Sequence, residues 1–187
     1  MIYIIDNFLQ DNILSKLNKY LVDFKEVDTG EKKFWIMDSS QDFNSYIVDR
    51  LSKIEGKQID NILSFFRVSN MEVDTDWRIH CDSIIAGKLP TRALVLYVSE
   101  EGSEDLNGTA LWEHKEHGVS MPYEKLTTKE FDNLILNESN KLDTWKLNTV
   151  IGYKKNRLLS YPSNYFHSKY PNVSWEEGRK IFVMFYK

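Results

Sequence analysis

Short runs of β-branched and aromatic residues, separated by polar breaks, dominate the chain after residue 60. Runs of this length and composition are typical of β-strands. Because about seven of them follow two helical segments, their order predicts an α+β fold built on an antiparallel sandwich or barrel. The predicted strands are residues 62–69, 77–83, 92–100, 108–115, 149–155, 156–162 and 179–187.

Two segments before these runs carry apolar residues at helical spacing. Residues 11–24 and 40–56 each place one apolar stripe along a helix. Ser40 suits the N-cap position of the second helix, and Gly56 suits its end. We expect both helices to cover one side of a sheet.

A third helical segment interrupts the predicted strands at residues 127–139. Thr127 and Glu130 form a capping-box pair at its start. This insertion is interpreted either as a lid or wall over a substrate or as a surface decoration, and the sequence leaves both interpretations open.

The composition describes a globular protein of ordinary size. The 187 residues include 42% hydrophobic and 28% charged residues, enough to bury one core. Without a repeat, a low-complexity tract or a linker, residues 1–187 are expected to form a single domain. The net charge of −4 and the pI near 5.6 provide no basic surface for phosphates, so we expect no nucleic-acid partner.

The sequence carries no targeting or membrane-spanning pattern. Residues 1–12 lack the basic region of a signal peptide, and no apolar run approaches the roughly 20 residues of a membrane-spanning helix. The single cysteine cannot form an internal disulfide. We expect a cytoplasmic protein without a membrane partner, and we make no prediction of its oligomeric state.

The stretch "WRIHCDS" places the only cysteine between a histidine and an aspartate. If this stretch is a strand, His80 and Asp82 point to one face, roughly 6.6 Å apart, and Cys81 points to the other. An imidazole and a carboxylate at that spacing can converge on one metal ion with bonds of about 2 Å. Cys81 is then a small buried residue, although a His-x-Asp pair can also arise by chance.

Two further residues near the C-terminus strengthen the metal hypothesis. His167 follows a predicted strand on a polar aromatic loop, and with His80 and Asp82 it makes a facial triad that leaves three coordination positions open, as in non-haem Fe(II) oxygenases. Arg179 begins the last strand, where its planar fork matches a carboxylate. The alternative for Arg179 is an exposed arginine at a strand end. A further arginine, Arg67, lies within a predicted strand, where a salt bridge is the default interpretation.

A competing cluster lies in "LWEHKEHG". Glu113, His114, Glu116 and His117 are interpreted as a solvated hairpin, as a different metal centre, or as part of the barrel mouth. In the last case, Trp112 and His114 would contact the substrate.

Several segments resemble, in their order along the chain, the Fe(II)/2-oxoglutarate-dependent dioxygenases, particularly the prolyl-4-hydroxylase-like branch. The segments are "IYIIDNFLQDNILSKL", "HCD", "RALVLYVSE", "NGTALWEH" and "NRLLSYPSNYFHS". Arg179, twelve residues after His167, takes the place of the arginine that binds 2-oxoglutarate in this family.

The resemblance implies a double-stranded β-helix, or jelly roll, with supporting helices. It implies that His80, Asp82 and His167 bind Fe(II) and that Arg179 binds the distal carboxylate of 2-oxoglutarate. Tyr97 would donate a second hydrogen bond to that carboxylate, or would simply be a core aromatic residue.

Two positions depart from the family pattern. Ile181 stands where many relatives have a serine, which puts the second donor to the carboxylate in doubt. Phe185 stands where the nucleic-acid demethylases of this superfamily carry a second arginine, which argues against nucleic-acid repair.

The implied activity is the O2-dependent hydroxylation of an unactivated C–H bond, coupled to decarboxylation of 2-oxoglutarate, with ascorbate as a candidate reductant. Asp82, as a carboxylate ligand, favours hydroxylation over halogenation. The substrate would be a peptidyl residue, an amino acid or a small metabolite. The alternatives are an inactive jelly-roll binding module and a cupin-like metalloenzyme that does not use 2-oxoglutarate.

Overall fold

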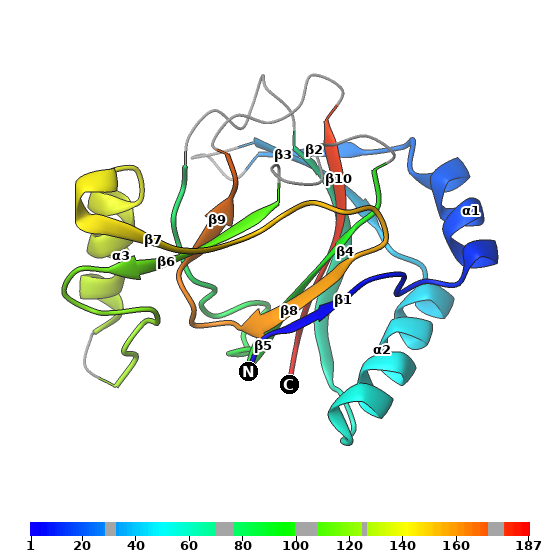
Figure 1. The fold of residues 1–187 in the computed structure, drawn as a ribbon, viewed down its shortest axis with the longest axis horizontal. Helices are drawn as coiled ribbons and strands as arrows, with labels where there is room; N and C mark the ends of the chain where they lie inside the picture. Colours follow the sequence, from blue (N-terminus) through cyan, green and yellow to red (C-terminus); the bar gives the residue numbers. More distant parts are fainter. Residues whose placement is uncertain (29–32, 70–76, 100–107, 125–126, 172–177) are drawn as a thin grey trace.

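Two antiparallel sheets form the centre of the protein in the computed structural model (Figure 1). The structure describes residues 1–28, 33–69, 77–99, 108–124, 127–171 and 178–187. The larger sheet contains, in spatial order, β1 (Tyr3–Ile5), β8 (Leu158–Pro162), β5 (Arg92–Tyr97), β10 (Arg179–Tyr186), β4 (Asn61–Ser69), β3 (Lys33–Asp38) and β2 (Lys25–Asp28). The smaller sheet contains β7 (Trp145–Ile151), β6 (Thr109–His114) and β9 (His167–Lys169).

Helices lie on the outer side of each sheet (Figure 1). Next to the larger sheet are α1 (Asp11–Tyr20) and α2 (Gln41–Glu55), and next to the smaller sheet are α3 (Thr128–Glu138) and the short 3-10 helix η1 (Leu142–Thr144). The Ser40 hydroxyl caps α2, Gly56 ends it at φ 68°, and the Thr127 capping box starts α3. All three boundary predictions are confirmed. Helix α1 ends earlier than expected because the chain turns at Leu21 toward the hairpin of β2 and β3.

The alternation of side chains along β5 separates two of the cores. Leu94 and Leu96 pack toward α1 and α2, whereas Val95 and Tyr97 pack toward the smaller sheet. A third core, which includes Trp112, lies between the smaller sheet and α3. The order of layers is therefore α1 and α2, larger sheet, smaller sheet, and α3. Helices combined with antiparallel sheets agree with the predicted α+β class.

Two predicted strands and one predicted loop position differ from the structure. Residues 77–83 form no regular strand, because Arg78 has a φ of 47° and only His80 makes a β-bridge, to His167. His167 itself lies on β9 rather than on a loop. The strand predicted at 149–155 is part of β7, which starts earlier at Trp145 and ends at Ile151.

The sequence pattern did not predict β2 and β3, the strands at one edge of the larger sheet. Strands β2 and β3 carry mixed charged and apolar residues; β3 pairs with β4 and β2 pairs with β3, and this pairing stabilises them rather than a local alternating pattern. In the described part of the chain, no helix is long and apolar enough to cross a membrane.

Candidate active site

The three predicted metal ligands meet on the inner face of the smaller sheet. One ligand atom from each of His80, Asp82 and His167 lies within 4.8 Å of the other two. His80 and His167 exchange two backbone hydrogen bonds, with N···O distances of 3.0 and 2.7 Å, and the Asp82 N–H donates to the Ser163 carbonyl at 2.9 Å. Backbone pairing between segments more than 80 residues apart therefore positions the triad.

Each histidine is held in one tautomer by a backbone carbonyl. Nδ1 of His80 lies 2.8 Å from the Arg78 oxygen, and Nδ1 of His167 lies 2.9 Å from the Tyr165 oxygen. Because a carbonyl only accepts hydrogen bonds, each Nδ1 carries a proton, which leaves Nε2 as the ring atom that can bond to a metal. Burial, followed by the charge of His167, holds the pKa of His80 well below its ordinary value, so His80 is a neutral ligand.

Asp82 is a buried carboxylate that lacks a full set of partners. Its side chain is 8% exposed, and among the described residues its Oδ2 atom has no hydrogen-bond partner. Burial raises the pKa of Asp82, and the nearby charge of His167 opposes this shift. A buried carboxylate oxygen without a partner is unfavourable unless a cation binds it. The donor set of two imidazole nitrogens and one carboxylate fits Fe(II).

The separations between the ligand atoms are somewhat larger than those around a bound metal ion. Two atoms that bond to one ion at about 2 Å lie no more than about 4 Å apart. Nε2 of His167 lies 3.9 Å from Oδ1 of Asp82, and the largest separation in the group, 4.8 Å, exceeds that limit by less than a bond length. All three side chains would have to move closer together to bond to one ion.

Cys81 faces away from the triad, as the alternation predicted. It packs with Ile79 and Trp112 in the core under α3, and its Sγ lies 3.7 Å from the Tyr123 hydroxyl. Burial raises the pKa of Cys81 to about 12, so the thiolate required of a nucleophile does not form near neutral pH. Tyr123 also donates a short hydrogen bond to the Asp82 carbonyl and thereby braces the backbone of a triad residue.

We expect Cys81→Ala to leave Fe(II) affinity and turnover unchanged and to lower the free energy of unfolding by about 1 kcal/mol, because a buried sulfur atom is removed. Metal titration and thermal unfolding of the variant test this expectation. A loss of activity in a variant that remains folded would contradict the assignment of Cys81 to the opposite face.

Arg179 and two hydroxyl groups gather at the other end of the inner face. Arg179 is 7% exposed, and its Nη1 donates to the Gly108 carbonyl at 2.5 Å. The Tyr97 hydroxyl lies 2.8 Å from Oγ1 of Thr109. Burial raises the pKa of Tyr97 although the Arg179 charge opposes the shift, so Tyr97 remains a phenol and a hydrogen-bond donor. Ile181 pairs with Tyr97 in register on β10 and offers no polar group to this cluster.

Thr109 was not identified from the sequence. It follows a glycine on β6, and a Cβ at Gly108 would lie 1.8 Å from the Ile151 oxygen, so only glycine permits this approach of β6 and β7. The Gly-Thr pair in "NGTALWEH" is the only trace of this role in the sequence.

Tyr161 connects the two ends of the inner face. Its ring centroid lies 4.8 Å from that of His167. Burial raises its pKa well above the ordinary value; the charge of Asp82 adds to this shift, and Arg179 opposes it. Tyr161 therefore packs beside the triad and belongs to the same core cluster as Tyr97, a role that the sequence did not reveal.

The predicted substrate residue Trp112 lies on the opposite face of β6 from the triad. Its Nε1 donates to Oγ of Ser168 at 2.9 Å, and its ring makes an edge contact with Trp77 under α3. His167 instead pairs in register with Leu111, which faces the larger sheet. The structure does not bring Trp112 to the triad, because neighbouring residues of a strand point to opposite faces.

His114 lies outside the group of metal-competent residues, and its predicted contact with a substrate stays a prediction. Its Nδ1 accepts the backbone N–H groups of Glu116 and His117, both at 3.2 Å, so its Nε2 donates to Glu138 at 2.9 Å. This arrangement anchors the end of α3 to the β6 hairpin. Within the described residues, the metal-competent group is the triad alone, and the cluster around His114 is a structural hairpin.

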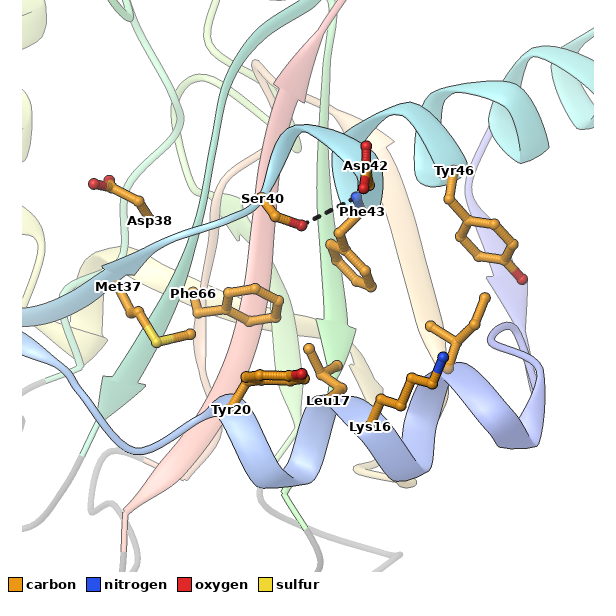
Figure 2. A pocket seen from close by; sticks show the side chains of 11 residues that line it. Lys16, Leu17, Tyr20, Met37, Asp38, Ser40, Asp42, Phe43, Tyr46 and Phe66 are labelled. Carbon is orange, nitrogen blue, oxygen red and sulfur yellow. Dashed lines mark hydrogen bonds between the residues drawn. The ribbon is translucent and has the colours of Figure 1, made fainter.

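A cavity of about 620 Å³ lies on the other side of the larger sheet, between α1, α2 and β3 (Figure 2). Apolar side chains, including Leu17, Phe43 and Phe66, form its wall, and Lys16 and Asp42 also line it. Because Phe66 faces α1 and α2, the larger sheet separates this cavity from the triad.

The protein was compared with known proteins by sequence and by fold. No protein-family model matches the sequence, and no curated protein is similar to it in sequence.

Several solved structures superpose over nearly the whole chain. HygX from Streptomyces hygroscopicus, crystallised with nickel, 2-oxoglutarate and hygromycin B, has a TM-score of 0.60 and 15% identity, covering 99% of this chain and 82% of HygX. The epimerase SnoN, in complex with Fe3+, alpha-ketoglutarate and nogalamycin RO, has a TM-score of 0.65 and 10% identity, covering 99% of this chain and 78% of SnoN. A prolyl-4-hydroxylase from Pseudomonas putida has a TM-score of 0.56 and 9% identity, covering 100% of this chain and 91% of that enzyme.

The chain has the fold of the 2-oxoglutarate-dependent oxygenases. The resemblance inferred from the sequence is thereby confirmed for the fold. In this oxygenase fold, the triad and the Arg179 cluster lie on one continuous inner face that Tyr161 bridges.

Proposed function

We propose that this protein is an Fe(II)- and 2-oxoglutarate-dependent oxygenase that hydroxylates an unactivated C–H bond of a small molecule. The observation that carries the proposal is the buried Asp82 carboxylate, whose Oδ2 has no partner among the described residues, beside two histidines that present Nε2. A small-molecule substrate is favoured over a peptidyl residue because HygX and SnoN were crystallised with hygromycin B and nogalamycin RO.

The proposal includes a double-stranded β-helix. The β-bridge at His80 adds a fourth segment beside β9, so the smaller sheet would contain four strands facing β8, β5, β10 and β4. The proposal also treats residues 1–187 as one domain, which the pairing of β1 with β8 and of β10 with both β5 and β4 supports. A cytoplasmic location and the absence of a nucleic-acid partner stay predictions.

Each residue of the inner face has a defined task in this reaction. His80, Asp82 and His167 hold the metal through two Nε2 atoms and a carboxylate. When bound, Fe(II) and 2-oxoglutarate supply the O2-dependent oxidation, in which 2-oxoglutarate loses CO2 to give succinate and one oxygen atom enters the substrate. Asp82, rather than a small residue, completes the triad and favours hydroxylation.

The far carboxylate of 2-oxoglutarate is assigned to the Arg179 cluster. Arg179 offers a planar pair of donors, and the hydroxyls of Tyr97 and Thr109 offer two more. Many relatives have a serine at the position of Ile181. In this chain, Thr109, from the opposite sheet, would donate the hydrogen bond that this serine gives to the carboxylate. Tyr161 lines the path between the two ends, and Leu111 and Ile181 exclude water from it.

The test is succinate formation by the purified protein supplied with Fe(II), 2-oxoglutarate, O2 and ascorbate. We expect slow succinate release without a substrate, faster release with a substrate, and none after chelation of the metal. Metal binding without any effect of 2-oxoglutarate would favour the cupin-like alternative, and binding of neither would favour an inactive binding module.

A further inference from the structure

The end of α3 is attached to the segment that carries His80. The Ile79 N–H donates to the Ser139 carbonyl at 2.9 Å. The Arg78 N–H donates to Oδ1 of Asn140 at 3.0 Å. Ser139 and Asn140 directly follow α3, and the Ile79 side chain is fully buried in the core under this helix. Two hydrogen bonds and one buried side chain therefore fix residues 78–79 to the insertion.

One peptide unit connects this attachment to the ring of His80. The Arg78 carbonyl and the Ile79 N–H belong to the same trans peptide, in which the two groups point in opposite directions. The N–H is held by Ser139, and the carbonyl lies 2.8 Å from Nδ1 of His80. The orientation of this peptide plane therefore sets the direction of the carbonyl that holds the imidazole.

Arg78 has a backbone conformation that depends on its surroundings. Its φ of 47° lies in the left-handed region, which is unfavourable for a residue with a Cβ atom. Such a conformation persists where the neighbouring structure holds it, and here Asn140 binds the N–H on one side of Arg78 while Ser139 binds the peptide on the other. If the Asn140 oxygen is removed, the backbone can relax toward negative φ and turn the Arg78 carbonyl away from Nδ1.

The end of α3 is itself fixed to the smaller sheet, on whose outer side the helix lies (Figure 1). The Glu138 side chain accepts the hydrogen bond from Nε2 of His114 at 2.9 Å. The Glu138 carbonyl accepts a hydrogen bond from Nε1 of Trp145 at 2.8 Å. The support of the His80 ring thus extends from β6 and β7, through the last turn of α3, to the Arg78 peptide.

We propose that Asn140 is a positioning residue of the metal site, which acts through the Arg78 peptide to keep His80 in the tautomer and orientation that direct Nε2 at the metal. Helix α3 is then a brace behind the site, a role that differs from both a substrate lid and a surface decoration. This inference rests on the proposed function, because it takes His80 to be a ligand of Fe(II). Removing a group that orients a metal-ligating histidine typically weakens metal binding by about 10–100-fold.

The test compares Co(II) binding by three variants in the absence of oxygen, followed by the visible absorption of the metal. Asn140→Ala removes the acceptor of the Arg78 N–H, whereas Asn140→Asp keeps an acceptor oxygen at the same position. Asn137→Ala is the matched control, because Asn137 is also exposed near this end of α3 but its Nδ2 donates within the helix, to the Asn133 carbonyl at 2.8 Å. We expect Asn140→Ala to bind Co(II) about ten-fold more weakly than the wild type, and the other two variants to bind it as the wild type does. Thermal unfolding without metal verifies that each variant is folded.

A second readout does not need a metal. In the metal-free protein, the NMR shifts of the His80 ring nitrogens report which nitrogen carries the proton. We expect a single Nδ1-protonated tautomer in the wild type, Asn140→Asp and Asn137→Ala, and a mixture of tautomers in Asn140→Ala. A wild-type tautomer in Asn140→Ala, or an equal loss of Co(II) affinity in Asn137→Ala, would overturn the inference. Absence of Co(II) binding by the wild type would instead count against the proposed function, and the tautomer would then decide whether Asn140 orients His80.

Discussion

Asp82→Ala is expected to abolish Fe(II) binding and turnover without lowering the stability of the metal-free protein. The loss of a metal ligand should exceed the roughly 10–100-fold effects that follow from changes to residues behind the ligands. The buried Oδ2 atom has no partner among the described residues. Removing a buried polar group of this kind relieves an unfavourable free energy of about 1–3 kcal/mol, which offsets the lost packing. The Tm of the metal-free variant should therefore equal or exceed that of the wild type.

The measurement is a pair of thermal unfolding curves, with and without Fe(II), for the wild type, Asp82→Ala and Cys81→Ala. Each kcal/mol corresponds to about 2–4 °C in a chain of this length. Fe(II) should raise the Tm of the wild type and of Cys81→Ala, but not that of Asp82→Ala. A metal-free Asp82→Ala protein that is several degrees less stable would indicate that Asp82 is a structural residue.

Arg179→Lys should weaken 2-oxoglutarate binding by about ten- to a hundred-fold, because lysine keeps the charge but loses the two-point fork. Fe(II) affinity should be unchanged, since arginine is not a ligand of the metal. The effect should appear in the KM for 2-oxoglutarate and in the stabilisation that 2-oxoglutarate gives to the Fe(II)-loaded protein. An unchanged 2-oxoglutarate dependence would show that the co-substrate anion binds elsewhere.

Thr109→Val is a matched partner for this variant, because it keeps the shape of the side chain and removes only the hydroxyl that lies 2.8 Å from Tyr97. The double variant Thr109→Val/Tyr97→Phe tests whether the two hydroxyls contribute to 2-oxoglutarate affinity together or independently. If both hydroxyls bind the same carboxylate, the double variant should lose less affinity than the two single variants added together.

The sequence by itself determined much of the local structure and which three residues form the candidate metal site. Ser40, Gly56 and Thr127 mark helix boundaries through backbone and capping chemistry that operates within a few residues. The His80–Cys81–Asp82 alternation held although residues 77–83 form no regular strand, because extended backbone turns successive side chains to opposite faces.

Only the tertiary structure decided which side chains share the inner face. Thr109 meets Tyr97 across two sheets and Tyr161 contacts His167, while His114 turns away to Glu138. These relations depend on which face of each strand meets the other sheet and on the register between strands far apart in the chain. A local pattern reports that a strand has two faces but not which partner each face will meet, because that choice is made by the packing of the whole sandwich.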